Sequence, residues 1–231
     1  MTIADEIATL DASLQRRYRV VETTELLRGR SLTILHPASA EELIDEQDFE
    51  RDERLPYWAE LWPSSCILGE EVLGLDGNGR TLLELGCGAG LVTTCAAIAG
   101  FDVTASDYYE DATLFARVNA WHNAQADVRA RHLDWRNIEN VGEFDVVIAS
   151  DVLYERPYGE LVAKVIGATL GTGGVAYLAD PGRVGREPFL AALPGAGLSV
   201  NSVGALPYVN GVIRQTITIY ELRRTNSARD R

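Results

Sequence analysis

The sequence predicts an α/β fold built on a mostly parallel, seven-stranded sheet, and three observations carry this prediction. Short apolar runs alternate with helical segments over residues 81–180, which is the order expected of β-α units. The first of these runs ends in a glycine-rich turn. Two strand-like stretches close the chain as a hairpin, so the last strand is expected to be antiparallel.

Length and charge restrict the class of protein and its partners. A chain of 231 residues fits one domain with a substantial core. The net charge of −13 argues against a nucleic-acid partner and favours a cationic one, although solubility alone also explains it. No apolar run approaches the roughly 18 residues that span a membrane, so no membrane partner is expected.

The cysteines and the N-terminus indicate the compartment. The spacing of Cys66, Cys87 and Cys95 fits neither a metal site nor a disulfide framework, so no metal is predicted. The first ten residues lack the basic and apolar regions of a signal peptide. We therefore expect a reduced, cytoplasmic setting.

Residues 1–54 are predicted to form an accessory layer on the main domain. A short helix is expected over residues 5–18, and two strands over 18–37 that are joined at Arg28 and Gly29. Residues 41–54 hold eight acids against two arginines. Such a run is usually a solvated face, but it could also collect a basic protein substrate.

The stretch TLLELGCGAGL, residues 81–91, is the strongest local signal. Its leucines suit a strand that is buried on both faces of a parallel sheet. Gly86, Gly88 and Gly90 allow a tight turn and close approach to a ligand. A helix follows over residues 91–100, so the stretch reads as a nucleotide-type cradle, or as a tight turn without a ligand.

The spacing of the glycines excludes one class of cradle. A dinucleotide fingerprint, G-x-G-x-x-G, would need its last glycine where Leu91 stands. An acid, Glu84, instead lies two residues before the first glycine.

Acids also end the strands that follow. Residues 101–107 end in Asp107, which could accept hydrogen bonds from ribose hydroxyls, cap the next helix, or do both. Residues 128–135 end in Asp134 and Trp135, and residues 144–151 end in Ser150 and Asp151. Ligands of open parallel sheets bind at the carboxyl ends of strands, so we expect these side chains to meet there.

An aromatic segment precedes the cradle. Tyr57, Trp58 and Trp62 lie within six residues, and Ser64 or Ser65 is expected to cap a helix that follows. Core packing is the simpler interpretation of these aromatics, and a wall for a flat or cationic ligand is the alternative.

The remaining elements complete the expected order. A helix is predicted from Pro157 to Leu170, ended by glycines 171, 173 and 174, and a strand over 175–180. A short helix at 188–193 and strands at 198–206 and 214–222 follow.

Taken together, these residues resemble a known family. The order E-L-G-x-G-x-G resembles motif I of the class I S-adenosylmethionine-dependent methyltransferases. Asp-Val-Leu-Tyr at 151–154, together with Trp62 and the Asp134-Trp135 pair, resembles the protein-lysine methyltransferases called methyltransferase family 16. PYWAELWP and ADPGR are similar to the branch that methylates the β-subunit of electron-transfer flavoprotein, to which nicotinamide N-methyltransferase-like names are also attached.

The resemblance implies a fold, a cofactor and a site. It implies a Rossmann-like class I methyltransferase domain over residues 55–224, with 225–231 as a disordered tail, and S-adenosylmethionine as the cofactor. It implies that Asp151 and Tyr154 face the substrate as catalytic residues. The implied cofactor-binding residues are Trp62, Glu84, Gly86, Cys87, Gly88, Gly90, Asp107, Asp134, Trp135 and Ser150.

The resemblance further implies N-methylation of a lysine in a protein substrate. In that case Asp151 would dock the ammonium, although a carboxylate by itself raises the pKa of the amine. A small-molecule N-methyltransferase and a catalytically silent S-adenosylmethionine-binding partner are the alternatives. Nucleic-acid amines are disfavoured, because those enzymes place N/D-P-P-Y where this chain has Asp-Val-Leu-Tyr.

Overall fold

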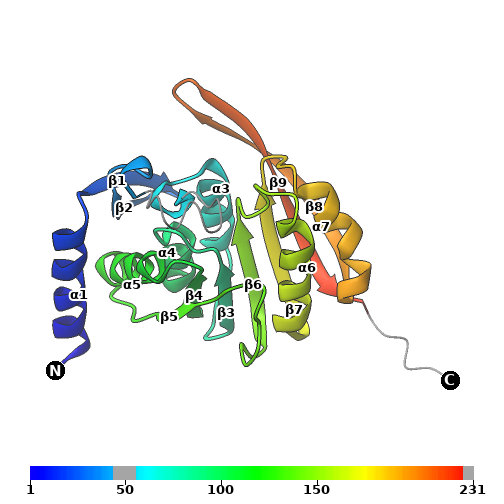
Figure 1. The fold of residues 1–231 in the computed structure, drawn as a ribbon, viewed down its shortest axis with the longest axis horizontal. Helices are drawn as coiled ribbons and strands as arrows, with labels where there is room; N and C mark the ends of the chain where they lie inside the picture. The colour runs from blue at the N-terminus through cyan, green and yellow to red at the C-terminus, as the bar shows by residue number, and fades with distance from the viewer. Residues whose placement is uncertain (44–55, 226–231) are drawn as a thin grey trace.

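A computed structural model describes residues 1–43 and 56–225 of the chain. The strands of the main sheet are β3 (Thr81–Leu85), β4 (Asp102–Asp107), β5 (Arg129–His132), β6 (Phe144–Ser150), β7 (Leu170–Asp180), β8 (Leu198–Asn210) and β9 (Ile213–Arg224). Their order in the sheet is β5-β4-β3-β6-β7-β9-β8 (Figure 1). The strands from β3 to β7 are parallel, and β9 is antiparallel to both of its neighbours. The predicted seven-stranded sheet with an antiparallel last strand is therefore confirmed.

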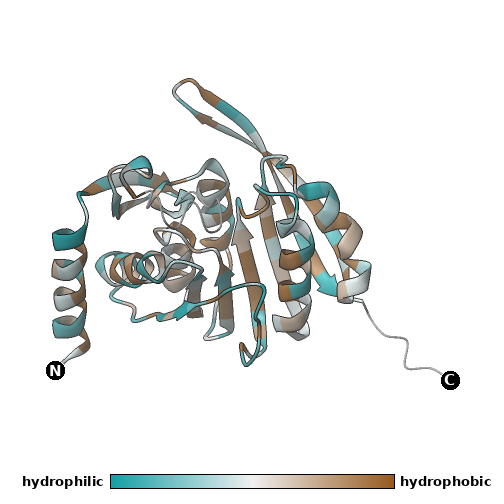
Figure 2. Cartoon of the chain, viewed as in Figure 1, coloured by the Kyte–Doolittle hydropathy of each residue, from teal (hydrophilic) through white to brown (hydrophobic). Residues whose placement is uncertain are grey.

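Helices cover both faces of this sheet. Helices α3 (Pro63–Val72), α4 (Leu91–Ile98) and α5 (Glu110–Ala124) lie on one face, and α6 (Tyr158–Thr169) and α7 (Arg186–Ala192) lie on the other (Figure 1). Successive side chains of β3 point to opposite faces of the sheet and so reach both helix layers. Leu82 packs with the α3–α4 core, while Leu83 and Leu85 pack with the α6–α7 core. Strand β6, in the middle of the sheet, is largely brown in Figure 2.

The N-terminal helix and hairpin lie against α5. Helix α1 (Ile3–Arg17) precedes the antiparallel hairpin of β1 (Val20–Leu27) and β2 (Arg30–Pro37). Ile7 and Leu14 of α1 share a hydrophobic cluster with Phe115 of α5, so α1 and α5 are joined by buried apolar contacts. Most of the predicted acidic run, residues 44–54, and the tail 226–231 lie outside the described residues. Glu41–Leu43 form a 3-10 helix, η1.

Two local predictions are wrong. Helix α3 begins at Pro63 with Trp62 as its N-cap and no side-chain cap, so neither Ser64 nor Ser65 caps it. Proline at the first helical position has no N–H that would need a cap. Strand β7 begins at Leu170, five residues before the predicted start, because Leu170 pairs with Phe144 of β6 and the glycines that follow continue the strand.

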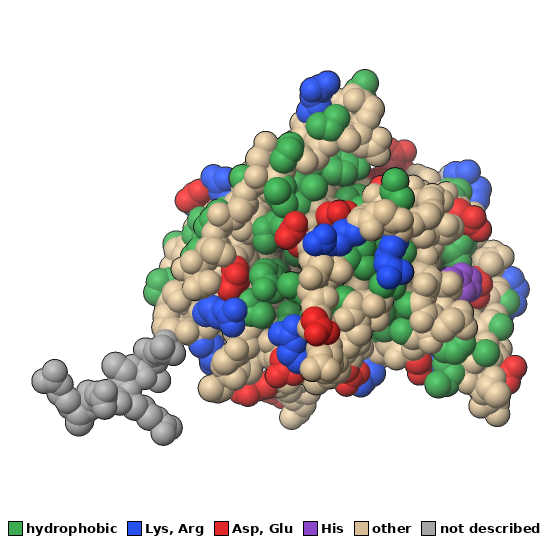
Figure 3. Space-filling view, turned by 180° about the vertical axis from the view of Figure 1, so that it is seen from behind, with side chains coloured by type: hydrophobic (Ala, Val, Ile, Leu, Met, Phe, Trp, Pro, Cys, Tyr) green, Lys and Arg blue, Asp and Glu red, His purple; other side chains and the backbone are tan. Residues whose placement is uncertain are grey.

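The β8–β9 hairpin is longer than predicted. Strand β9 pairs with β7 over Thr218–Leu222, whereas its pairing with β8 continues to Asn210 and Ile213. The end of the hairpin that pairs only with itself projects beyond the sheet (Figure 1), and hydrophobic side chains gather along it (Figure 3). Among the described residues, no helix has the length and apolar character that crossing a membrane requires.

The strand order places a crevice between two halves of the sheet. From β3 the chain moves to one edge through β4 and β5, and it then crosses back to β6 on the other side of β3. The chain leaves β3 toward β4 and leaves β6 toward β7, so the loops that follow these two neighbouring strands run in opposite directions. In open α/β sheets this switch point is where ligands bind.

Candidate functional site

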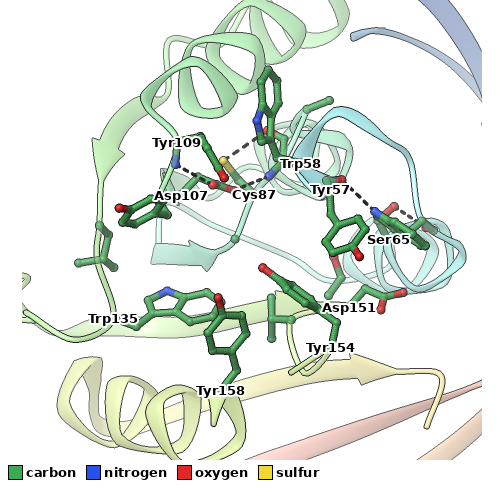
Figure 4. Close-up of a pocket in the computed structure, with 18 of the residues that line it drawn as sticks. Tyr57, Trp58, Ser65, Cys87, Asp107, Tyr109, Trp135, Asp151, Tyr154 and Tyr158 are labelled. Atoms are coloured by element: carbon green, nitrogen blue, oxygen red, sulfur yellow. Dashed lines mark hydrogen bonds between the residues drawn. The ribbon is translucent and has the colours of Figure 1, made fainter. Parts of the chain in front are cut away.

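A cavity of about 300 Å³ lies at the carboxyl ends of β3, β4, β5 and β6 (Figure 4). The turn η2 (Tyr57–Ala59) and the start of α3 close it from the side. The residues predicted from sequence that line the cavity are Trp62, Gly86, Cys87, Gly88, Gly90, Asp107, Asp134, Trp135, Ser150, Asp151 and Tyr154. Glu84 does not line it.

The loop after β3 depends on its glycines. Gly86, Gly88 and Gly90 have φ values of +68°, +51° and +87°, a region that other residues rarely adopt. A Cβ at Gly88 would lie 3.1 Å from the carbonyl oxygen of Trp58, and one at Gly90 would lie 2.3 Å from Cα of Ala116. Gly88 thus lets the loop approach η2, and Gly90 lets it pack on α5.

Glu84 lies beneath this loop. Alternation along β3 turns its side chain toward α4, where it is 1% exposed and accepts a hydrogen bond from the Thr93 hydroxyl. Burial raises the pKa of Glu84 to about 8, so the carboxyl group is mostly protonated at neutral pH. This neutral, hydrogen-bonded carboxyl joins β3 to α4.

Asp107 joins the loop to the next helix. One carboxylate oxygen accepts from the Gly88 amide at 3.0 Å, and the other accepts from the Tyr109 amide at 3.0 Å. The N-cap residue of α5 is Tyr109, whose side chain makes no capping hydrogen bond. Asp107 is therefore not the N-cap of α5, but its carboxylate binds the backbone amide of the N-cap residue. Burial raises the pKa of Asp107, and the two amides oppose that rise.

The loop after β5 and the cysteine of the glycine loop line the same half of the cavity. Asp134 is paired with Arg136 at 2.7 Å, and the Trp135 ring packs edge-on against Tyr158 at 5.6 Å. The indole Nε1 of Trp135 is a buried donor that has no hydrogen-bond partner among the described residues. Burial raises the pKa of the Cys87 thiol well above its usual value, so this group packs as a neutral thiol.

Asp151 lies opposite, at the end of β6, and is already paired. Its φ of +57° is unusual for a residue with a side chain, and its side chain is 4% exposed. Arg183 donates to one carboxylate oxygen at 2.6 Å, and the Ser64 hydroxyl donates to the other at 3.0 Å. The Arg183 guanidinium also lies 5.1 Å from the centre of the Trp62 ring. A cationic acceptor would therefore meet a carboxylate whose charge is balanced.

Tyr154 belongs to a row of aromatic side chains (Figure 4). Its ring contacts Tyr57 at 5.3 Å and Tyr158 at 5.1 Å, both edge-on. Trp62 extends the row beyond Tyr57, and Trp135 extends it beyond Tyr158. Burial, assisted by nearby acids and Tyr158, raises the pKa of Tyr154 far above its usual range, so the phenol stays protonated.

The cavity as a whole is acidic. Its described lining carries one basic side chain, Arg136, and five acidic ones: Glu60, Asp107, Asp134, Asp151 and Glu155. Such a lining suits ligands that carry positive charge.

The sequence analysis assigns no site role to three residues that contribute to the site. Tyr158 falls inside the helix predicted from Pro157, Ser64 is expected only as a helix cap, and Arg183 appears only as the last residue of ADPGR. Arg183 had a usable signal, because it follows the carboxyl end of β7, and β7 is the neighbour of β6. Ser64 had none, since its contact with Asp151 joins residues 87 positions apart.

Comparison with known sequences gives a family and two kinds of relative. A family model described as lysine methyltransferase matches residues 57–188. EEF1A lysine methyltransferase 3 of Mus musculus is 32% identical over 148 residues, which cover 61% of this chain and 63% of that protein. Ubiquinone biosynthesis O-methyltransferase of Bordetella avium is 29% identical over 120 residues, 52% of this chain and 49% of that protein. The chain thus spans 63% and 49% of the length of these two curated relatives.

Solved structures match the fold. Magnesium protoporphyrin IX methyltransferase of Synechocystis PCC 6803, solved with bound S-adenosylmethionine, has a TM-score of 0.57 at 19% identity and covers 78% of this chain and 93% of its own. N-methyltransferase NodS of Bradyrhizobium japonicum WM9, in complex with S-adenosylhomocysteine, has a TM-score of 0.53 at 16% identity and covers 78% and 94%. At these identities the likeness establishes the Rossmann-like methyltransferase fold.

Proposed function

The chain belongs to the lysine methyltransferase family, and from this premise we propose that it is an S-adenosylmethionine-dependent methyltransferase that N-methylates a lysine side chain of a protein. The observation that supports this most strongly is the composition of one cavity. The glycine loop and Asp107 form one side of it, and Asp151 and Tyr154 form the other. The proposed partner is the protein that carries this lysine, and neither a nucleic acid nor a membrane is part of the proposal.

The cofactor half suits S-adenosylmethionine on three counts. Side chains at Gly86 and Gly88 would fill the cradle, because a Cβ there would lie 2.9 Å from Val152 Cγ1 or 3.1 Å from the Trp58 carbonyl oxygen. Asp107 keeps lone pairs for hydroxyl donors after accepting its two amide hydrogens. Trp135 offers a flat face at the end of β5 and a buried donor that still lacks a partner.

The residues on each side then have separate tasks. S-adenosylmethionine, when bound, supplies a methyl group that is activated for transfer. Asp107 and Trp135 hold and orient the nucleoside end, while Trp62, Tyr57 and Tyr154 exclude water from the acceptor end. Alignment of the acceptor with an activated group is the main contribution that such a site makes to the rate.

The acceptor amine must be neutral before it can react. A lysine amine has a reference pKa of about 10.4, and burial among aromatic rings favours its neutral form. Arg183 balances the charge of Asp151, so this carboxylate orients the amine without holding it strongly as an ammonium ion. Tyr154, which stays protonated, positions the amine through its hydroxyl, and the amine loses its proton to water.

A small-molecule methyltransferase is the second candidate. The similarity to ubiquinone biosynthesis O-methyltransferases supports it, and an aromatic wall would also accept a flat ring. A silent cofactor-binding module is a third outcome that the same experiment detects.

The test is transfer of labelled methyl groups from S-adenosylmethionine into lysate of a strain that lacks this gene, followed by mass spectrometry. Label in lysine side chains of a protein would support the first function. Label confined to small molecules would support the second. Tight binding of S-adenosylhomocysteine without any transfer would point to the silent module, and absence of binding would contradict all three.

A further inference from the structure

Two asparagine side chains on α5 form hydrogen bonds with the backbone of strand β2 in the N-terminal hairpin. The amide oxygen of Asn119 accepts from the Leu35 N–H at 2.8 Å, and its amide nitrogen donates to the Leu35 carbonyl at 2.8 Å. Asn123, one turn further, makes the same pair of bonds with Thr33, at 3.1 and 2.9 Å. The two side chains thus bind β2 as a neighbouring strand would.

Asn119 also reaches the glycine loop, and Asn123 does not. The second N–H of Asn119 donates to the carbonyl oxygen of Ala89 at 2.8 Å, between Gly88 and Gly90. The second N–H of Asn123 instead donates to the backbone oxygen of Asn119 at 2.9 Å. Asn119 is 0% exposed, and both of its N–H groups and its oxygen are engaged.

Strand β2 also contacts η2, the turn that packs against the glycine loop. His36, next to Leu35, places its ring Nδ1 3.0 Å from the carbonyl oxygen of Ala59 in η2. The residue before Ala59 is Trp58, whose carbonyl limits the space at Gly88. One short segment of the hairpin is therefore bonded to η2 directly and to the glycine loop through Asn119.

We propose that Asn119 is a positioning residue for cofactor binding, through which the N-terminal hairpin holds the glycine loop in its ligand-binding shape. The family match begins at residue 57, so the hairpin lies outside it, and this role gives the hairpin a function. The inference rests on the proposed function, because it takes the loop as the cofactor site.

The physical basis is the freedom of the loop backbone. Gly86, Gly88 and Gly90 can each populate conformations other than the one observed, and this freedom opposes a single binding shape. The Asn119 amide fixes the Ala89 carbonyl in the middle of the loop. Without that amide the carbonyl loses its protein partner in a buried place, so other loop conformations gain population at the expense of the binding one.

The test compares Asn119→Ala with Asn123→Ala by calorimetric titration of S-adenosylhomocysteine into the full chain. Both variants lose two bonds to β2, and Asn119→Ala alone loses the bond to the loop. Asn119→Ala is expected to weaken binding by about tenfold or more, because the population of the binding shape falls. Asn123→Ala is expected to stay within about twofold of wild type, as for a site without contact to the loop. Both titrations are run well below the thermal midpoints of the variants.

Equal affinities in the three proteins would overturn the inference, and so would equal losses in the two variants. A wild type that does not bind S-adenosylhomocysteine would overturn the proposed function and the inference with it, so the two failures are distinguishable.

Hydrogen exchange on the wild type supplies a second measurement that does not depend on how well a variant folds. Coupling between two sites is reciprocal, so S-adenosylhomocysteine is expected to slow exchange at the Leu35 amide, which lies behind Asn119 from the loop. Slowing that is confined to the segments lining the cavity would overturn the inference.

Discussion

The two halves of the cavity are built in different ways. The cofactor half is mostly backbone: a loop of three glycines with positive φ, and a carboxylate, Asp107, whose oxygens accept two backbone amides. The acceptor half is mostly side chains from separate elements, with Asp151 held by Arg183 and Ser64 beside a row of aromatic rings.

Because of this difference, substitutions in the two halves should have different effects. Damage to the backbone half disturbs the loop, its packing on α5 and the affinity for the cofactor together. Damage to the acceptor half removes one side chain from a surface that the others still support. We therefore expect changes in the first half to reduce stability and binding, and changes in the second half to reduce turnover.

The largest effect is expected from Gly90→Ala. The new Cβ would lie 2.3 Å from Cα of Ala116, a backbone atom that cannot move aside, and φ at this position is +87°. We expect the free energy of unfolding to fall by about 3 kcal/mol or more, measured by urea denaturation. Gly195→Ala is the control, because its Cβ would meet no atom within 4 Å. Similar midpoints for the two variants would contradict this account of the loop.

Asp151→Asn is expected to act on turnover alone. The variant keeps the shape of the side chain but leaves the Arg183 charge unbalanced near a cationic acceptor. Methyl transfer should fall by about tenfold or more while the affinity for S-adenosylhomocysteine stays within about twofold. Asp127→Asn removes an acid that is paired with Arg117 away from the cavity, and it should leave transfer unchanged. Normal transfer by Asp151→Asn would remove Asp151 from the mechanism.

Glu84→Gln is expected to flatten the dependence of stability on pH. The pKa of Glu84 is about 8 in the folded protein against 4.5 for an unperturbed glutamate, so the folded state holds an extra proton between these values. Raising the pH through that window lowers the free energy of unfolding, with a slope on the order of 1 kcal/mol per pH unit. The variant lacks this contribution, so its stability relative to wild type should rise with pH.

Denaturation at a series of pH values between about 5 and 8 measures this slope directly. The exposed Glu22→Gln is the control and should follow the wild type. Parallel curves for wild type and Glu84→Gln would show that Glu84 is ionised in the folded state.

Arg183→Met is expected to have the smallest effect, visible in the pH profile of methyl transfer. Asp151 would then lack its counter-charge, with Asp180 as a second nearby acid and Glu60 and Glu155 on the cavity wall. An unbalanced carboxylate raises the pKa of a bound amine, so the rising limb of the profile should move to higher pH by up to about one unit. The double variant Asp151→Asn with Arg183→Met should restore its position. A profile that does not move would limit Arg183 to a structural role.

The sequence predicts the cofactor half of the cavity better than the acceptor half. Glycine spacing and acids at strand ends are local signals, and the loop, Asp107 and Trp135 that they single out all line the cavity. Glu84 is predicted to bind the cofactor from its position in the motif, whereas alternation along β3 turns its side chain toward α4 and Thr93. Position in a motif does not specify which face of the strand a side chain occupies.

The acceptor half depends on contacts that local patterns do not contain. The pairing of Asp151 with Arg183 requires β6 and β7 to be neighbours, and the contact with Ser64 requires α3 to start beside them. The longer β8–β9 hairpin has a similar origin, because its free part is stabilised by pairing between its own two strands beyond the last contact with β7.

The most direct test of the two-part cavity is calorimetric titration of S-adenosylhomocysteine into wild type, Asp107→Ala and Asp151→Asn. Asp107→Ala loses the acceptor of the Gly88 and Tyr109 amides, so binding should weaken by about tenfold or more. Asp151→Asn should bind within about twofold of wild type, because it lies in the other half. Normal binding by Asp107→Ala, or an equal loss in both variants, would contradict the division of the cavity into a cofactor half and an acceptor half.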